Sequence, residues 1–276
     1  MGKRKAKKTN RLRNWLIIIG LSLIMLLSIA FIFRRPIIYY TKYVYHKIVP
    51  AKRLKEVPSS NTKTNLYIDV QLPKAEVYGI DISRHQGVIN WKRLSEFRFR
   101  YHKIDFIYIK ATESVEWVDD KFAKNWRNAK KHNFIRGAYH FFDPEFSAEL
   151  QMKNFFAKVK LHKGDLPPML DVEQESKIMT SSYRKKVIKC LTLMEQHYGI
   201  RPILYTNQSF YDSYFSTTDF KKYSLWLSRL KITEPKQQNW VIWQFSHTAV
   251  VPGIDEYVDF NVFNGTINKF KILQKK

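Results

Sequence analysis

From residue 77 onward, short apolar strand patterns alternate with amphipathic helix patterns, and this alternation constrains the fold more than any other feature. A chain of this kind builds a parallel sheet covered by helices, because each crossover between parallel strands needs a helix-length connection. The strand patterns cover Tyr78–Ser83, Asp105–Ala111, Phe134–Phe142, Pro168–Glu173, Arg201–Thr206, Ser224–Arg229, Trp240–Ser246 and Tyr257–Asn261. Eight such strands predict a closed α/β barrel of the TIM type.

The helix signals lie mostly in the first two thirds of this region. Asn90 can cap a short helix that runs to Phe97, and Asp119 or Asp120 can cap the next one. Helices are also predicted over 147–160 and over 180–198, where Gly199 ends the pattern. The connections 230–239 and 247–256 are too short for a helix and a parallel crossover. We therefore expect an irregular TIM-like barrel with a helix-poor C-terminal third, which leaves room for an antiparallel step.

The N-terminal part of the chain is basic and then strongly apolar. An uncharged run from Trp15 to Phe33 follows a segment rich in lysine and arginine, and it is about long enough to span a bilayer as a helix. The preceding cations place the N-terminus in the cytoplasm and the rest of the chain outside the cytoplasmic membrane. We expect a basic tail (1–13), a transmembrane anchor (14–33), a juxtamembrane stalk (34–76) and a barrel domain (77–276). The alternative is a cleaved signal peptide with Ser28-Ile29-Ala30 as the cleavage site.

Charge and cysteine content limit the classes of partner. The formal net charge is +24, which favours an anionic partner such as lipid headgroups, nucleic acid or an anionic wall polymer. Cys190 is the single cysteine, so no intrachain disulfide can form. No cluster of histidine and cysteine has metal-ligand spacing, so neither a metal nor another cofactor is predicted.

Asp171 and Glu173 follow a short apolar run that reads as a buried strand. Side chains two positions apart on a strand share a face, about 6–7 Å apart at the backbone. Two carboxyl groups at that spacing raise each other's proton affinity, which suits the cleavage of a glycosidic bond. The alternative is that both are solvated acids where a strand leaves the barrel.

Further candidate residues lie where the other predicted strands end. Catalytic sites of such barrels form at the C-terminal ends of the strands. Asp81 in the first strand and Asp259 in the last should lie side by side, because these strands are neighbours in a closed barrel. Aromatic and amide side chains that could bind a sugar lie at the same ends: Tyr139, Phe141, Tyr205, Trp226, Trp243 and Gln244.

Eight short blocks of this sequence resemble the lysozymes of glycoside hydrolase family 25, the N,O-diacetylmuramidase type. The blocks occur in the family's order and extend over about residues 77–270: GIDISRHQGVINW, YIKATE, GAYHFF, LPPMLDVE, PILYT, LW, IWQFS and VDFN. The resemblance implies an irregular β/α barrel that cleaves peptidoglycan glycan strands between N-acetylmuramic acid and N-acetylglucosamine.

The resemblance also implies roles for individual residues. Glu173 matches the general acid/base, and Asp171 matches a partner that orients the acetamido group of the substrate or stabilises charge. Asp81 and Asp259 match the other two acids of the family site, and Tyr139 matches its tyrosine. The sequence departs from the family at Ser114, where glycine is usual, and at 227–229, where a small residue often follows the LW pair.

Two other classes of function compete with a membrane-anchored peptidoglycan hydrolase. The first is a non-catalytic protein that binds cell-wall glycan on the same barrel, although all four acids are present. The second is a membrane-tethered nucleic-acid binder, motivated by the charge of +24. We expect no nucleic-acid partner, because no nucleic-acid-binding fold is recognisable and the barrel is predicted on the wall side of the membrane.

Overall fold

The computed structural model describes residues 15–25, 71–230, 233–237 and 239–276. Residues 15–25 form a helix. Among the residues that the structure describes, no helix combines the length and the apolar composition needed to cross a bilayer. The basic tail, part of the proposed anchor (14 and 26–33) and most of the stalk lie outside the described residues.

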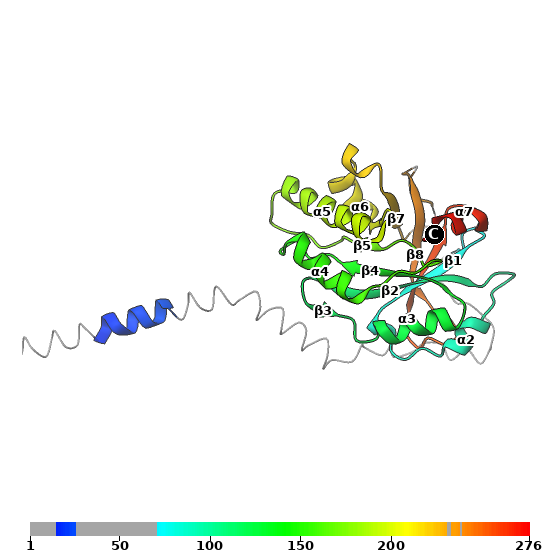
Figure 1. The fold of residues 1–276 in the computed structure, drawn as a ribbon, viewed down its shortest axis with the longest axis horizontal. Coiled ribbons are helices and arrows are strands. Elements are labelled where there is room, and N and C mark those ends of the chain that lie inside the picture. Colours follow the sequence, from blue (N-terminus) through cyan, green and yellow to red (C-terminus); the bar gives the residue numbers. More distant parts are fainter. Residues whose placement is uncertain (1–14, 26–70, 231–232, 238) are drawn as a thin grey trace, which may run out of the picture. The chain divides into compact units, whose positions relative to one another are not determined.

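Eight strands of the described chain close into a barrel (Figure 1). In sheet order they are β1 (Tyr78–Ile82), β9 (Val258–Phe263), β8 (Trp240–Ala249), β7 (Ser224–Ser228), β6 (Ile203–Asn207), β5 (Met169–Asp171), β4 (Ile135–Phe141) and β2 (Ile104–Glu113). Pairing of β1 with β2 closes the ring, and the two-residue β3 (Trp117–Val118) adds to the edge of β2. The predicted eight-stranded barrel is confirmed.

The last strand runs against the others. The pairs from β1 through β2, β4, β5, β6, β7 to β8 are all parallel. In contrast, β9 is antiparallel to both β8 and β1. This is the antiparallel step that the short connection 247–256 allowed, since an antiparallel pair needs no helical crossover. The expectation for 230–239 is wrong, because β7 and β8 are parallel although no helix lies among the described residues that connect them.

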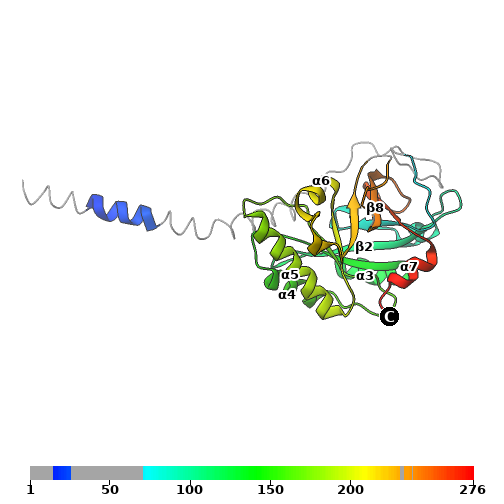
Figure 2. The ribbon, with the colours of Figure 1, turned by 90° about the horizontal axis from the view of Figure 1, so that it is seen from above.

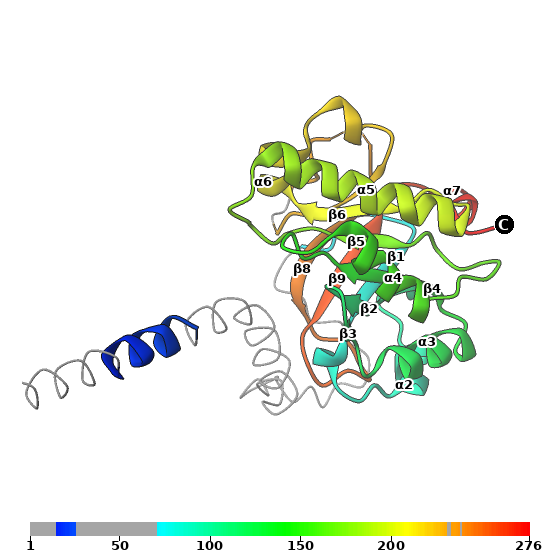
Figure 3. The ribbon, with the colours of Figure 1, turned by 60° about the vertical axis from the view of Figure 1, so that its left-hand side comes forward.

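Helices cover the first part of the barrel (Figures 2 and 3). They are α2 (Trp91–Glu96), α3 (Phe122–Lys131), α4 (Ala148–Lys158) and α5 (Thr180–Tyr198). Beyond β6 the helical elements of the described residues are short. They are α6 (Gln208–Phe210), a π turn (Tyr211–Phe215), a 3-10 turn (Thr218–Phe220) and the C-terminal α7 (Ile267–Leu273). The predicted helix-poor C-terminal third is confirmed.

Several of the predicted helix ends are confirmed by the capping groups. The Asn90 side chain accepts a hydrogen bond from the Arg93 N–H at the start of α2, and Gly199 ends α5 with a left-handed φ of 66°. The helix predicted after Asp119 and Asp120 is present as α3, but neither aspartate caps it, because it begins at Phe122 without a side-chain cap. The Asp119 carboxylate instead accepts from the N–H groups of Arg84 and Lys121, which ties the loop after β1 to the loop after β3.

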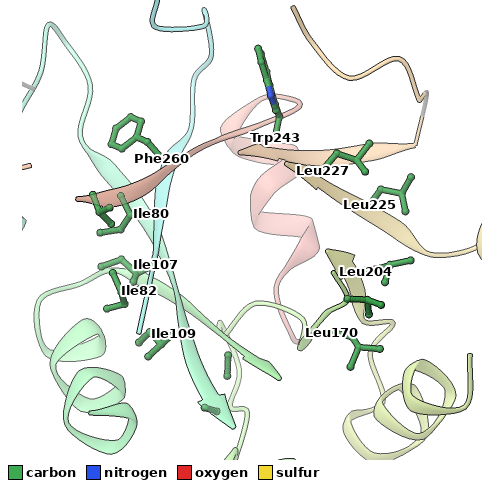
Figure 4. Close-up of a cluster of buried hydrophobic side chains, with 14 of the residues drawn as sticks. Ile80, Ile82, Ile107, Ile109, Leu170, Leu204, Leu225, Leu227, Trp243 and Phe260 are labelled. Atoms are coloured by element: carbon green, nitrogen blue, oxygen red, sulfur yellow. The ribbon is translucent and has the colours of Figure 1, made fainter. Parts of the chain in front are cut away.

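Alternation along the strands divides the apolar side chains into two cores. Residues that face outward pack under the helices, and Figure 4 shows Ile107, Leu170, Leu225 and Trp243 among them. Residues that face inward fill the barrel, including Phe106 and Tyr108. These rings need room from their neighbours. A Cβ atom on Gly137 would lie 2.3 Å from the Tyr108 ring, so glycine is required there.

Candidate active site

A cavity of about 350 Å³ opens at the C-terminal ends of the parallel strands. Its lining includes all four predicted acids, Asp81, Asp171, Glu173 and Asp259, at the end of the barrel where such sites form. The other lining residues are Ile82, Ser83, His85, Gln86, Lys110, Tyr139, Phe141, Met169, Tyr205 and Gln244. Acids dominate this cavity, so its chemistry is that of proton transfer and the stabilisation of positive charge.

The first two acids lie side by side on adjacent strands. Asp81 on β1 pairs in register with Asp259 on β9, as the closed barrel predicted. Their carboxyl groups share a hydrogen bond, which requires one of the two to keep a proton. Burial and the neighbouring Asp81 charge raise the pKa of Asp259 to about 9. Asp259 is therefore the protonated partner at neutral pH, and it donates to Asp81.

Amide groups hold the Asp81 carboxylate from the other side. The Asn261 Nδ2 atom donates to Asp81 Oδ2 over 2.8 Å, and the Gln244 Nε2 atom donates to the same oxygen over 3.3 Å. Burial raises the pKa of Asp81 to about 6, while these hydrogen bonds act to lower it. Asp81 is therefore mostly ionised at neutral pH despite being only 9% exposed.

Two further side chains fix the orientation of these amides. The Tyr205 hydroxyl donates to Gln244 Oε1 over 2.9 Å, and the Trp226 indole N–H donates to Asn261 Oδ1 over 3.1 Å. Each donor occupies the amide oxygen, so the amide N–H₂ group is turned toward Asp81. The network thus extends from the barrel core to the carboxylate.

Asp171 and Glu173 line the cavity together but differ in environment. β5 ends at Asp171, so Glu173 lies just beyond the strand rather than within it, which corrects the predicted strand end. Asp171 is 7% exposed and its Oδ1 atom is buried without a hydrogen-bond partner, whereas Glu173 is exposed at the cavity mouth. Burial and the Glu173 charge raise the pKa of Asp171 well above its usual value. Burial and the Asp81 charge raise the pKa of Glu173.

Of the predicted sugar-binding residues, four line the cavity: Tyr139, Phe141, Tyr205 and Gln244. The two tryptophans do not, and that prediction is corrected. Trp243 is 1% exposed and points away from the barrel interior (Figure 4), with its indole N–H donating to the Arg229 carbonyl oxygen. Trp226 points inward but is 0% exposed, packed against Tyr108 and Tyr205 below the cavity. Alternation along β8 turns residue 243 to the opposite face from Gln244.

Sequence reasoning missed six lining residues, which are Ile82, Ser83, His85, Gln86, Lys110 and Met169, and it also missed Asn261. Two of these residues, Lys110 and Asn261, bear directly on the charges of the site. Lys110 on β2 lines the cavity, with its ammonium group 2.7 Å from Glu113 Oε2 and 4.6 Å from the centre of the Phe141 ring. Asn261 makes the shorter of the two amide hydrogen bonds to Asp81. Strand alternation could have found both, because Lys110 is two positions beyond the inward-facing Tyr108 and Asn261 is two beyond Asp259.

Comparison with known proteins agrees with this arrangement. The family model for glycosyl hydrolases family 25 matches residues 80–254. The chain belongs to glycosyl hydrolases family 25. It is therefore a glycoside hydrolase, as the eight sequence blocks predicted.

Similar proteins and solved structures support the assignment. The chain is 36% identical over 197 residues to "Uncharacterized protein YegX" of Escherichia coli, covering 71% of this chain and 72% of the relative. It is 29% identical to "Lysozyme M1" of Streptomyces globisporus, covering 69% and 68%. A family 25 glycosyl hydrolase from Bacillus anthracis superposes with a TM-score of 0.67 at 29% identity, over 75% of this chain and 97% of that one. A bacterial lysozyme from Streptomyces coelicolor gives 0.67 at 28%, over 73% and 98%.

His140 is a buried polar residue that does not line the cavity. His140 on β4 faces outward, between Thr112 Oγ1 at 2.7 Å and Gln151 Oε1 at 3.2 Å. Burial lowers the pKa of His140 to about 4, so the ring is neutral and structural. Within the described residues, no group of three or more His, Cys, Asp or Glu side chains is arranged to hold a metal ion.

Proposed function

We propose that this protein is a muramidase that cleaves the β-1,4 bond between N-acetylmuramic acid and N-acetylglucosamine in peptidoglycan. The observation that carries the proposal is that the cavity acids differ in their exposure to solvent. Glu173 alone of the four belongs to the exposed residues, at the mouth of the cavity, while Asp81 and Asp171 are buried. A reachable carboxyl group with a raised pKa is what protonation of a leaving oxygen requires. The lysozyme names of the relatives support this choice of substrate.

In this proposal Glu173 is the general acid and then the general base. It donates its proton to the glycosidic oxygen as the bond to the anomeric carbon breaks, and later removes a proton from the attacking water. Positive charge develops on the sugar ring in between. The Asp81 carboxylate, which hydrogen bonds keep ionised inside the cavity, is placed to stabilise that charge.

Two routes remain for the anomeric carbon, and Asp171 takes part in both. Either the acetamido oxygen of the substrate attacks while Asp171 holds the acetamido group, or an aspartate attacks directly. The direct route needs a carboxylate at Asp171, whose pKa is raised by burial and by the Glu173 charge. When Glu173 is protonated, it carries no charge and no longer raises the pKa of Asp171. Both routes predict net retention of anomeric configuration.

Exchange of Glu173 for glutamine tests the assignment of the acid. Glu173→Gln keeps the shape of the side chain and removes its proton, so the rate on purified cell wall should fall roughly 10²–10⁴-fold. Glu175→Gln is the matched control, because Glu175 is exposed in the same loop but does not line the cavity. A Glu173→Gln protein with the wild-type rate would contradict the assignment.

Mass spectrometry of the wild-type digest tests the proposed bond. Fragments that end in N-acetylmuramic acid at the reducing end are expected. Fragments that end in N-acetylglucosamine would refute the muramidase specificity, and an intact wall with bound protein would support the non-catalytic alternative. Proton NMR of the first anomer formed tests retention, and an inverted product would exclude both routes through Asp171.

Attachment to the cytoplasmic membrane is a second part of the proposal. The support is the sequence alone, namely the cations of residues 1–13 and the uncharged run that follows them. Residues 77–276 are then the catalytic barrel outside the membrane, on a stalk formed by 34–76. A reporter fused after Lys276 should work only if it is active outside the cytoplasm. A mature N-terminus near Phe31 would show a cleaved signal peptide instead.

A further inference from the structure

The two ends of the barrel differ in charge. The parallel strands all begin at one end and finish at the other, so the loops that lead into them share the end opposite the cavity. These entry loops carry exposed cations that no motif explains. We name them the basic end face: Arg100, Lys103, Lys131, Lys160, Lys163 and Lys222.

The acids at this end do little to neutralise these cations. Asp165 is held by the buried Arg136, with 2.8 Å between Oδ1 and Nε, and Glu195 pairs with Arg201. Of the basic end face, Lys103 lies 3.9 Å from Asp105. The other five cations form no ion pair with any residue that the structure describes. The exposed acids Glu76, Glu96 and Asp219 also precede strands at this end, but they form no ion pair with the basic end face. The face therefore presents an excess of positive charge to solvent.

A hairpin at the same end adds an aromatic side chain. Phe99 and His102 bridge the two arms, and Arg100 adopts a left-handed φ of 52° at the turn. This geometry leaves Tyr101 100% exposed, between the cations Arg100 and Lys103. A tyrosine among cations is the combination that lies at the headgroup level of membranes, because the ring is apolar and the hydroxyl group is polar.

The chain enters the barrel at this end. The Tyr78 hydroxyl donates to the Pro73 carbonyl oxygen over 2.7 Å and accepts from the Ala75 N–H, and the Tyr78 N–H donates to Asp105 at the start of β2. Residues 73–77 therefore enter the barrel at the end that carries the basic end face. The cavity acids lie at the other end.

We propose that the basic end face docks on the anionic surface of the lipid bilayer and turns the catalytic mouth away from it. This inference rests on the proposed anchor, which holds the barrel near the membrane so that weak attraction suffices. Anionic headgroups attract the cations and repel the acids of the cavity. Docking would thus orient the cavity toward glycan strands on the far side of the enzyme.

A fluorescent probe at two positions tests the orientation. Cys190 is buried, so the new cysteine of a Tyr101→Cys variant can be labelled selectively. Glu116→Cys is the matched control, exposed at the cavity end of the barrel. Each labelled full-length protein is reconstituted into phosphatidylcholine vesicles with or without phosphatidylglycerol, both with a nitroxide on the headgroup of a tracer lipid as quencher.

Docking predicts several-fold stronger quenching at position 101 than at position 116, in the anionic vesicles only. High salt should abolish the difference, because it screens attraction between exposed charges. The double variant Lys160→Glu with Lys163→Glu should also abolish the difference in quenching between the two positions. The control pair, Lys177→Glu with Lys185→Glu, changes the net charge equally near the cavity end and should leave the difference in place.

Each other outcome has a distinct meaning. Equal quenching at the two positions, or equal quenching in neutral and anionic vesicles, overturns the docking. If a soluble poly(glycerol phosphate) binds the basic end face while the vesicles do not, the occupant is a wall polymer and the proposal is wrong. A protein that enters neither kind of vesicle refutes the proposed anchor rather than the orientation.

Discussion

Removing the amide of Asn261 should move the acid limb of the pH–rate profile to higher pH. Asn261 Nδ2 makes the shorter of the two amide hydrogen bonds to Asp81, whose pKa burial raises to about 6. A hydrogen bond to a charged group contributes about 1.5–3 kcal/mol, and one pKa unit corresponds to about 1.4 kcal/mol. Asn261→Ala should therefore raise the pKa of Asp81 by about 1–2 units. If catalysis needs ionised Asp81, activity below that higher pKa is lost.

The measurement is kcat/KM against pH, which reports the pKa values of the free enzyme. Asn261→Ala also leaves the Trp226 indole N–H without its acceptor, at a cost of about 1–3 kcal/mol in stability. Trp226→Phe is the control, because it breaks the same indole hydrogen bond but leaves Asn261 Nδ2 on Asp81. The control should lose similar stability with a much smaller shift in the acid limb. An unchanged acid limb in folded Asn261→Ala would refute the role given to Asp81.

Three further predictions concern stability. Since the pKa of Asp259 is raised from 3.8 to about 9, the folded state keeps a proton that the unfolded state releases, and this stabilisation is lost as pH rises through that range. Asp259→Asn can still donate to Asp81 but cannot ionise, so its Tm should exceed that of wild type near pH 9 and match it near pH 4; equal Tm differences at both pH values would contradict this. Ser114 has φ of 50° and a buried hydroxyl group without a partner, so Ser114→Gly should raise the free energy of unfolding by about 1–2 kcal/mol in urea titrations. A loss of stability there would show that the hydroxyl has a favourable role. Asp165→Asn leaves Arg136 buried without its anion and should cost about 3–5 kcal/mol, while the rate per folded molecule stays that of wild type. A changed rate would show that this pair acts on the cavity.

Periodicity in the sequence was enough to predict the barrel and much of its site. Helix and strand periods depend on which face of an element is buried, so they are local signals that each segment carries by itself. They predicted the eight strands and the helix over 180–198. Gly199 predicted the end of that helix, and the length of the connection 247–256 left room for the antiparallel step. Closure of such a barrel then predicts that Asp81 lies beside Asp259, as it does in the structure.

Tertiary structure decided which side chains reach the cavity and in which protonation state. Trp226 and Trp243 lie on predicted strands near the site, but neither lines the cavity. Trp226 points into the barrel below the cavity, and alternation along β8 turns Trp243 to the outer face. Alternation along β2 turns Lys110 into the cavity, and alternation along β9 brings Asn261 against Asp81 without making it part of the cavity lining. The pKa values of Asp81 and Asp259 depend on burial and on hydrogen bonds between strands far apart in the chain. Such contacts form only when the barrel closes, so no local pattern in the sequence could have predicted which aspartate keeps the proton.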